Sequence, residues 1–397
     1  CNIASGAPPE CAREIGLRVF LSRVLSTFAT SPARLEAMHA LRGAARRLKL
    51  QPAVVRYFHQ ADDPYSVLAA HALAPLQQRY RLRVERHAVP PPIREAAPEP
   101  EMLAAYAQRD AALLAKAYGL PAPTPEAETA STETLAAGAA LRAKLGHYQG
   151  AMFEYQREWF WGLDRLHYLE ARLARAGLDR QRGAAPLFPA LDYDLAKARP
   201  GARRPELHFF LSFRSPYTFI AAELIEDIAK AHGAELKLRF VLPMVMRGLP
   251  VPPAKRLYIM LDAKREASRR GLKFGTMVDP VGKGAERGLA VLHHAIAAGK
   301  GPAFMRSFLR GVFAEGLDAA SEQGLITMAA RAGVGAQEVR AALADPSWRP
   351  VAENNRQEMF AHGVWGVPSF RVNECPMIWG QDRLFALQAQ IVDADEA

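Results

Sequence analysis

Two stretches of this chain repeat one pattern, and the repetition limits the folds that are open to it. Each stretch has a short apolar segment, then a proline that opens a helical pattern, then a segment of alternating apolar and charged residues. The proline is Pro64 in the first stretch and Pro216 in the second, 152 positions later. The order strand, helix, strand predicts an α/β fold in both places. Two long copies favour two related domains, because a solenoid needs more and shorter repeats.

The two copies also end alike. Trp161 begins the sequence WGLDRL, and Trp379 begins WGQDRL. These tryptophans are 218 positions apart, so the second copy holds 66 more residues than the first. The added length shows helical periodicity, and the first copy keeps a shortened version of it. The predicted parts are a basic helical segment at 1–50, a degenerate domain at 51–180, a linker rich in glycine and proline at 181–205, and a second domain at 206–397 with a helical insertion at 243–350.

The first fifty residues are predicted to form one or two helices. Apolar residues recur there at helical spacing from Leu17 to Leu48, and arginines lie between them. We expect these helices to pack on the body of the protein with their basic face in solvent. Binding to a membrane surface is the alternative interpretation.

Composition restricts the other functions of the chain. The net charge is +10, but no nucleic-acid-binding motif accompanies it, so we predict no nucleic-acid partner. No apolar run approaches the roughly eighteen residues of a membrane span, so no integral membrane segment is predicted. Cys1, Cys11 and Cys375 form neither a C-x-x-C pair nor a metal-ligand spacing. We therefore expect no metal and no disulfide framework, and a cytoplasmic protein.

Ser215 is the strongest candidate for a functional residue. It lies where an apolar strand gives way to the helix that Pro216 opens, in the tetrapeptide SPYT. Its hydroxyl and the first free N–H groups of the helix are expected to meet at one point, which favours an anion. A helix-capping role alone also explains a serine here. A second motif, GVPSF at 366–370, has a proline at the start of a strand, where a cis peptide bond is expected.

The order of these motifs resembles a known family. A strand, SPY, a helix, a helical insertion, GVPSF and WGQDRL occur in the order found in the DsbA-like branch of the thioredoxin superfamily. Within that branch the chain is most similar to the group of 2-hydroxychromene-2-carboxylate isomerases and kappa-class glutathione transferases. The resemblance covers about 206–391. Together with the repeat it implies tandem thioredoxin-like domains of the α/β class, each with a helical insertion in its core.

The resemblance implies a chemistry that borrows its thiol. DsbA-like oxidoreductases carry cysteines at the positions of Ser215 and Thr218, and a hydroxyl cannot form the mixed disulfide that thiol exchange needs. A dithiol oxidoreductase is therefore excluded. In the isomerase and kappa-class group a serine stands at this position and glutathione brings the thiol. Ser215 would then stabilise the thiolate by hydrogen bonding, for attack on a small aromatic electrophile in an isomerisation or a transfer.

The same resemblance assigns the contacts to glutathione. Val367, just before the expected cis Pro368, would pair its backbone with the cysteinyl part. Asp382, preceded by Gln381, would receive the γ-glutamyl ammonium. The remaining assignments are the glycyl carboxylate to Lys255 or Arg256, which solvated helix faces explain equally well, and the substrate to Tyr217, Trp365 and Trp379.

The first copy is degenerate in these positions. Asp63 replaces the serine, and Gly150 falls at the cis-proline position when Trp161 is aligned with Trp379. A carboxylate would repel a thiolate, so this copy is predicted to be structural. The chain would then fold as a pseudo-dimer with one active half, and further oligomerisation stays open. The alternative function is a non-catalytic thioredoxin-like module that binds a peptide or small ligand beside Pro368.

Overall fold

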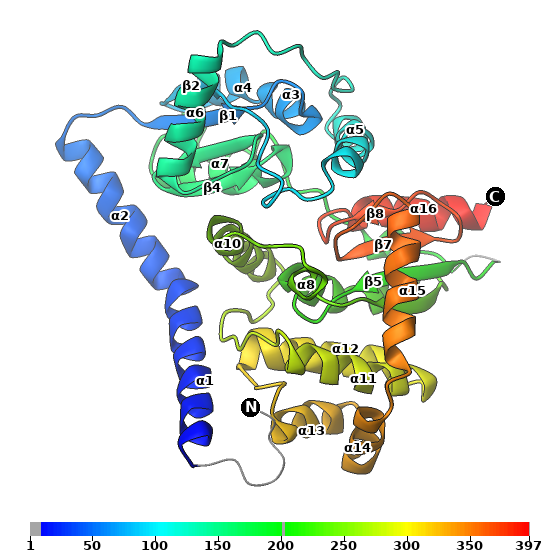
Figure 1. The fold of residues 1–397 in the computed structure, drawn as a ribbon. Coiled ribbons are helices and arrows are strands. Elements are labelled where there is room, and N and C mark those ends of the chain that lie inside the picture. Colours follow the sequence, from blue (N-terminus) through cyan, green and yellow to red (C-terminus); the bar gives the residue numbers. More distant parts are fainter. Residues whose placement is uncertain (1–8, 201–202, 397) are drawn as a thin grey trace. The chain divides into compact units, whose positions relative to one another are not determined.

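The computed structural model describes residues 9–200 and 203–396, so Cys1 lies outside the described residues. The chain divides into two compact units, each of the α/β class (Figure 1). The N-terminal unit comprises residues 35–193 and 249–258. The C-terminal unit comprises the described parts of 1–34, 194–248 and 259–397.

A four-stranded sheet forms the centre of the C-terminal unit, in the order β6-β5-β7-β8. The central strand β5 is parallel to β6 and antiparallel to β7, and β7 is antiparallel to β8. Five of the six residues of β5 are buried, because helices and strands cover it on every side. The strands are β5 (Glu206–Leu211), β6 (Glu235–Phe240), β7 (Ser369–Val372) and β8 (Ile378–Trp379).

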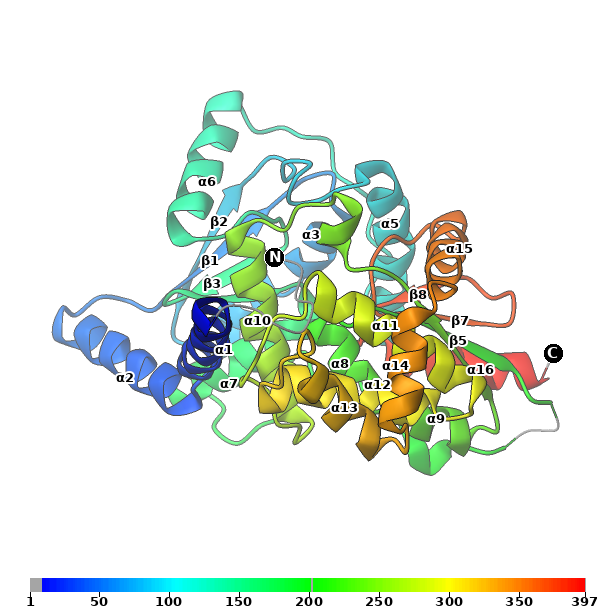
Figure 2. The ribbon, with the colours of Figure 1, turned by 60° about the horizontal axis from the view of Figure 1, so that its bottom comes forward.

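Helices fill the chain between β6 and β7. Among them α12 packs against α8, which follows β5, and against α11 and α13 (Figure 2). Phe213, directly before α8, stacks on Phe308 of α12 with ring centroids 4.0 Å apart. The helices of the unit after residue 194 are α8 (Pro216–Ala222), α9 (Ile225–Ala231), α10 (Pro253–Arg269, of which residues 259–269 belong here), α11 (Lys283–Ala297), α12 (Gly301–Arg310), α13 (Glu322–Arg331), α14 (Ala336–Ala344), α15 (Trp348–Ala361) and α16 (Leu384–Glu396), with short turns of helix at Leu195–Lys197, Met244–Arg247 and Gly311–Glu315.

The N-terminal unit holds a second four-stranded sheet with the same order and directions, β2-β1-β3-β4. The pairing Val54 with Arg83 in this sheet corresponds to Glu206 with Glu235 in the other, 152 positions later in both strands. Helices lie between β2 and β3, where the sequence predicts the shortened insertion. The elements are β1 (Val54–His59), α3 (Pro64–Ala70), α4 (Leu73–Arg79), β2 (Arg83–Ala88), α5 (Pro100–Ala117), α6 (Thr132–Leu145), β3 (Met152–Tyr155), β4 (Glu158–Trp161), a short turn of helix at Leu163–Arg165 and α7 (Leu166–Arg175), preceded by α2 (Pro32–Leu48).

Helix α1 (Pro9–Ala29) packs on the C-terminal unit by its polar face. Arg23 Nε donates to Gly316 O at 2.7 Å, Ser22 Oγ donates to Met277 O at 2.9 Å, and Ser26 Oγ accepts from Met277 N at 2.9 Å. The opposite face carries six large apolar side chains that are 45% to 63% exposed. The expectation that a basic face would point to solvent is therefore wrong for α1. The six residues are Leu17, Phe20, Leu21, Val24, Leu25 and Phe28.

No helix among the described residues is long and apolar enough to cross a membrane. No group of three or more histidine, cysteine, aspartate or glutamate side chains is placed to hold a metal ion in the part of the chain that the structure describes.

Candidate functional site

Ser215 lies at the junction of β5 and α8, where the sequence places it. It is the N-cap of α8, and its Oγ accepts a hydrogen bond from Thr218 N at 3.1 Å. Proline at the first helical position leaves one donor fewer to satisfy there, so one serine hydroxyl suffices as the cap. The side chain is half-buried rather than enclosed. Because α8 has only seven residues, its dipole is weak, and the hydroxyl itself is the main polar group at this point.

The second motif meets Ser215 directly. The Val367–Pro368 peptide bond is cis, which confirms the prediction. Ser215 Oγ donates to Val367 O at 3.2 Å. The WGQD turn lies against the same peptide, since Gly380 N donates to Pro368 O at 2.9 Å. Three motifs that are far apart in sequence therefore converge on one place in the C-terminal unit.

Thr218 lies in the first turn of α8, and its N–H is the donor to Ser215 Oγ. Its side chain is fully buried, and Oγ1 has no hydrogen-bond partner among the described residues. An unpartnered hydroxyl in the core is costly. Pro368 explains the missing donor in part, because proline has no backbone N–H.

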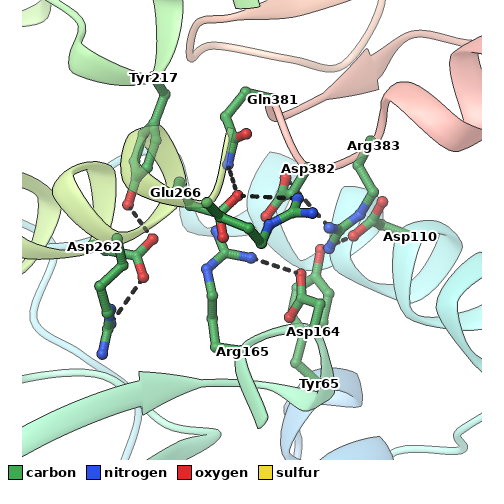
Figure 3. A network of polar contacts seen from close by, with 12 residues as sticks. Tyr65, Asp110, Asp164, Arg165, Tyr217, Asp262, Glu266, Gln381, Asp382 and Arg383 are labelled. Atoms are coloured by element: carbon green, nitrogen blue, oxygen red, sulfur yellow. Dashed lines mark hydrogen bonds and ion pairs between the residues drawn. The ribbon is translucent and has the colours of Figure 1, made fainter. Parts of the chain in front are cut away.

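Two carboxylates on α10 hold the polar side chains of the motifs (Figure 3). The Tyr217 hydroxyl donates to Asp262 Oδ2 at 2.8 Å, and Gln381 Nε2 donates to Glu266 Oε2 at 2.9 Å. Both carboxylates are buried, and each also binds an arginine one turn further along α10. Gln381 is itself buried. Its Nε2 is therefore bonded inside the protein, whereas its Oε1 has no hydrogen-bond partner among the described residues.

Trp365 and Trp379, both predicted to contact substrate, contact each other. Their ring centroids are 5.0 Å apart in an edge-to-face arrangement. Trp365 is buried, whereas Trp379 is half-buried. A side chain at Gly366 would lie 2.1 Å from the Trp379 ring, so only glycine fits this approach. The two rings pack next to the cis peptide, because Trp365 shortly precedes it and Gly380, directly after Trp379, is hydrogen-bonded to Pro368 O.

Comparison with protein families decides the fold of this segment. Residues 206–392 match the model of the DSBA-like thioredoxin domain. This segment is a DsbA-like thioredoxin domain. The match begins after residues 35–193 of the N-terminal unit and includes that unit's segment 249–258. The strand order β6-β5-β7-β8 and the cis-proline contact described above lie within the matched segment.

Solved structures similar to this chain come from the same branch. One is a 2-hydroxychromene-2-carboxylate isomerase, at 20% identity and a TM-score of 0.40, covering 48% of this chain and 99% of that one. A second is the cytosolic disulfide reductase DsbM of Pseudomonas aeruginosa, at 20% identity and a TM-score of 0.38, covering 48% and 97%. A third is a probable DsbA oxidoreductase from Streptomyces coelicolor, at 21% identity and a TM-score of 0.38. The match covers 48% of this chain and 91% of that one. A search of the curated proteins gave no match.

The remaining predicted residues, Asp382, Lys255 and Arg256, have contacts of their own. Asp382 lies in the WGQD turn, 3.3 Å from Arg383 Nη1, and keeps a small exposed fraction. Lys255 and Arg256 lie in the first turns of α10, which belong to the N-terminal unit. Lys255 Nζ donates to Ala96 O of that unit at 2.8 Å, and burial lowers the pKa of Lys255 to about 8. Arg256 is exposed.

Arg247 is a residue of the DsbA-like domain that sequence reasoning missed. It ends the short helical turn Met244–Arg247 after β6, and its Nη2 donates to Trp365 O at 3.3 Å. Burial, with the positive charge of Arg356 adding to it, lowers the pKa of Arg247 to about 10. A single arginine between Met246 and a glycine turn was the only sequence signal. The structure places this cation beside the segment that leads to the cis peptide.

At the corresponding position in the N-terminal unit, the polar side chains are hydrogen-bonded within the unit. Asp63 caps α3 and accepts hydrogen bonds from Tyr65 N, Ser66 N and Ser66 Oγ, at 3.2, 3.1 and 2.8 Å. Burial raises the pKa of Asp63 to about 6 although these hydrogen bonds lower it. Ser66 Oγ also accepts from Ala151 N at 2.7 Å. Asp63 and Ser66 are thus bonded to groups of their own unit.

The strand register corrects the position that corresponds to Pro368. Phe58 pairs with Met152 and Phe210 pairs with Ser369, so the residue before Met152, Ala151, corresponds to Pro368. Gly162 N donates to Ala151 O just as Gly380 N donates to Pro368 O, both at 2.9 Å. The assignment of Gly150 to this position is therefore wrong by one residue.

Proposed function

We propose that the DsbA-like domain binds glutathione beside Ser215 and uses its thiolate to isomerise a small aromatic electrophile or to attach to it. The observation that carries the proposal is the half-buried Ser215 hydroxyl in contact with the cis Val367–Pro368 peptide, in a domain with no cysteine at either thiol position. Bound glutathione would supply the thiol nucleophile that this place lacks.

Ser215 would hold the thiol in its ionised form. Its hydroxyl is half-buried, so rotation about χ1 can turn the O–H from Val367 O to a sulfur beside the cis peptide. A hydrogen bond to the charged form favours that form and lowers the thiol pKa. The backbone of Val367 would align the cysteinyl part of the tripeptide.

The other residues fit glutathione unequally. Asp382 lies in the WGQD turn with its side chain 15% exposed, and we assign it to the γ-glutamyl ammonium. Gln381 is buried and bonded to Glu266, so it supports the turn rather than the ligand. Arg247 is a cation beside Trp365 and is better placed than Lys255, which is bonded to Ala96 O. We therefore assign the glycyl carboxylate to Arg247 within this proposal.

The glutathione thiolate can carry out either an isomerisation or a transfer. In isomerisation the thiolate adds to a conjugated double bond, a single bond rotates, and elimination restores both the double bond and the thiolate. In transfer the thiolate forms a thioether, and the electrophile releases a leaving group or takes up a proton. Both need the same ionised thiol, so Ser215 serves either.

The proposal extends to the whole chain in two respects. Residues 51–180 are a degenerate thioredoxin-like copy that makes the chain a pseudo-dimer, since its sheet has the strand order and register of the other. The compartment is the cytoplasm, where glutathione is reduced and cysteines such as Cys375 stay free.

Calorimetric titration of the full chain with glutathione tests the proposal. We expect one site in the wild type and an affinity at least tenfold lower in Ser215→Ala. Ser321→Ala is the matched control, because Ser321 caps α13 in the same unit with the same acceptor bond, to Gly324 N at 3.0 Å. The control should bind as the wild type does.

Two results would remove the assignment. Absence of glutathione binding to the wild type leaves the domain as a non-catalytic binding module. An equal loss in Ser215→Ala and Ser321→Ala means that the serine acts only as a helix cap.

A further inference from the structure

A basic hollow lies in the N-terminal unit between α2 and the sheet. Its volume is about 490 Å³, which is within the range of small-molecule sites. The wall on the helix side carries Arg42, Arg46 and Lys49, and the wall on the sheet side carries Arg56 and Arg83. All of these residues belong to one compact unit.

The cations of the two walls differ in their partners. Arg56 is bonded to Glu154 at 2.8 Å, and Glu85 lies next to both Arg56 and Arg83. The helix side has no such acids. Arg42 Nη1 donates to Gln156 O at 2.7 Å and Arg46 Nη1 donates to Gln51 O at 3.0 Å, and both acceptors are neutral backbone carbonyls.

Three cations on one wall of the hollow therefore have no carboxylate partner among the described residues. Arg46 in addition keeps a buried Nε without a hydrogen bond in the described part of the chain. Guanidinium groups with spare donors match the oxygens of phosphate groups.

Tyr155 gives an independent indication of a ligand. It lines the hollow, is only 1% exposed, and its hydroxyl has no hydrogen-bond partner among the described residues. Buried hydroxyls are normally bonded, so this one needs an acceptor. An oxyanion in the hollow would be such an acceptor, because the guanidinium of Arg172, which lies 5.6 Å from the centroid of the Tyr155 ring, offers only donors.

We propose that this hollow binds a small molecule that carries two or more phosphate groups. Three unmatched cations and one free hydroxyl donor suit a charge of about −3, whereas a single carboxylate would leave two cations unmatched. The cations surround one open hollow next to the buried Tyr155 rather than forming a long stripe, which favours a small ligand over a nucleic acid. The site is separate from the Ser215 site and does not depend on the function proposed there.

Calorimetric titration of the full chain with pyrophosphate at about 0.15 M salt tests the proposal. We expect one site per chain, and a loss of affinity of about tenfold in Lys49→Ala and in Arg46→Ala. Arg47→Ala is the matched control, since Arg47 is exposed on the same helix and does not line the hollow. It makes the same change in net charge and should alter the affinity less than threefold.

Tyr155→Phe distinguishes binding in this hollow from general electrostatic attraction, because it leaves the net charge unchanged. It removes only a hydroxyl that has no protein partner, so the fold should be at least as stable while pyrophosphate binds several-fold more weakly. The proposal is overturned by no pyrophosphate binding to the wild type, by equal losses in Arg46→Ala and Arg47→Ala, or by unchanged affinity in Tyr155→Phe. Tighter binding of a 20-mer oligonucleotide that Arg46→Ala abolishes would assign the surface to nucleic acid instead.

Discussion

At the scale of single residues, the two sheets differ in one backbone N–H group, at the start of β3 in the N-terminal unit and of β7 in the C-terminal unit. Ala151 has this N–H and donates it to Ser66 Oγ, whereas Pro368 at the equivalent position has none. Ser66 and Thr218 are 152 positions apart, and each is the third residue of its helix, α3 and α8 respectively. The hydroxyl of Ser66 is thus satisfied, and that of Thr218 is buried without a partner in the described residues.

Matched substitutions at these two positions should have opposite effects on stability. Thr218→Val replaces an unpartnered hydroxyl by a methyl group of similar size, so we expect the free energy of unfolding to rise by about 1 kcal/mol. Ser66→Ala leaves Ala151 N and Asp63 without their partner, and should cost about 1–3 kcal/mol. Urea unfolding of the full chain measures both. A loss of stability in Thr218→Val would mean that its hydroxyl is bonded.

Sequence predicts such residues where a motif lies at the junction of two elements. Ser215 and the cis Pro368 could be placed because each sits at a strand end that local pattern fixes. Gly150 was misassigned because Met152 pairs with Trp161 nine positions on, whereas Ser369 pairs with Trp379 ten positions on. The hairpin lengths differ by one residue, and an alignment on tryptophans carries that difference into the strand.

At the scale of elements, α1 shows how periodicity falls short. The pattern of Leu17, Leu21, Val24 and Phe28 predicts a helix with one apolar face. This pattern does not reveal which face of α1 packs against the rest of the C-terminal unit. Serine and arginine on the other face find backbone partners at Met277 and Gly316, and such pairings between distant segments leave no local trace in sequence.

Substitutions on the two faces of α1 test this packing. Ser26→Ala leaves Met277 N without its acceptor, so we expect a loss of about 1 kcal/mol in the free energy of unfolding. Leu25→Gln, on a residue that is 63% exposed, should stay within about 0.5 kcal/mol of wild type. Urea unfolding measures both variants. A larger cost for Leu25→Gln than for Ser26→Ala would show that the apolar face is the covered one.

At the scale of the whole molecule, the compact units do not follow the order of the chain. Residues 249–258 come after β6 of the C-terminal unit but belong to the N-terminal unit. Lys255 is bonded to Ala96 O there, and the Tyr258 ring lies 4.9 Å from that of His147. Sequence could predict two domains from the repeat, but not this exchange, since a ten-residue segment carries no signal for its distant partners.

A fragment of residues 194–397 should therefore be vulnerable at this segment. Without Ala96 and His147 the first turns of α10 lose their support, and we expect trypsin to cut after Lys255 or Arg256 at least tenfold faster than in the full chain. Mass spectrometry of timed digests gives the rates. Cleavage after Lys283, which begins a helix wholly within the C-terminal unit, is the internal reference. Equal rates in fragment and full chain would contradict the exchange.

The single N–H of Ala151 also bears on how this protein can change over generations. A place like that of Ser215 in the N-terminal unit would need changes at Asp63, Ser66 and Ala151, and the first two positions are coupled because Ser66 Oγ donates to Asp63 and accepts from Ala151 N. A variant that changes Asp63 or Ser66 to alanine alone should therefore be less stable than its parent. A Ser215-like site in the N-terminal unit would thus have to arise through less stable intermediates.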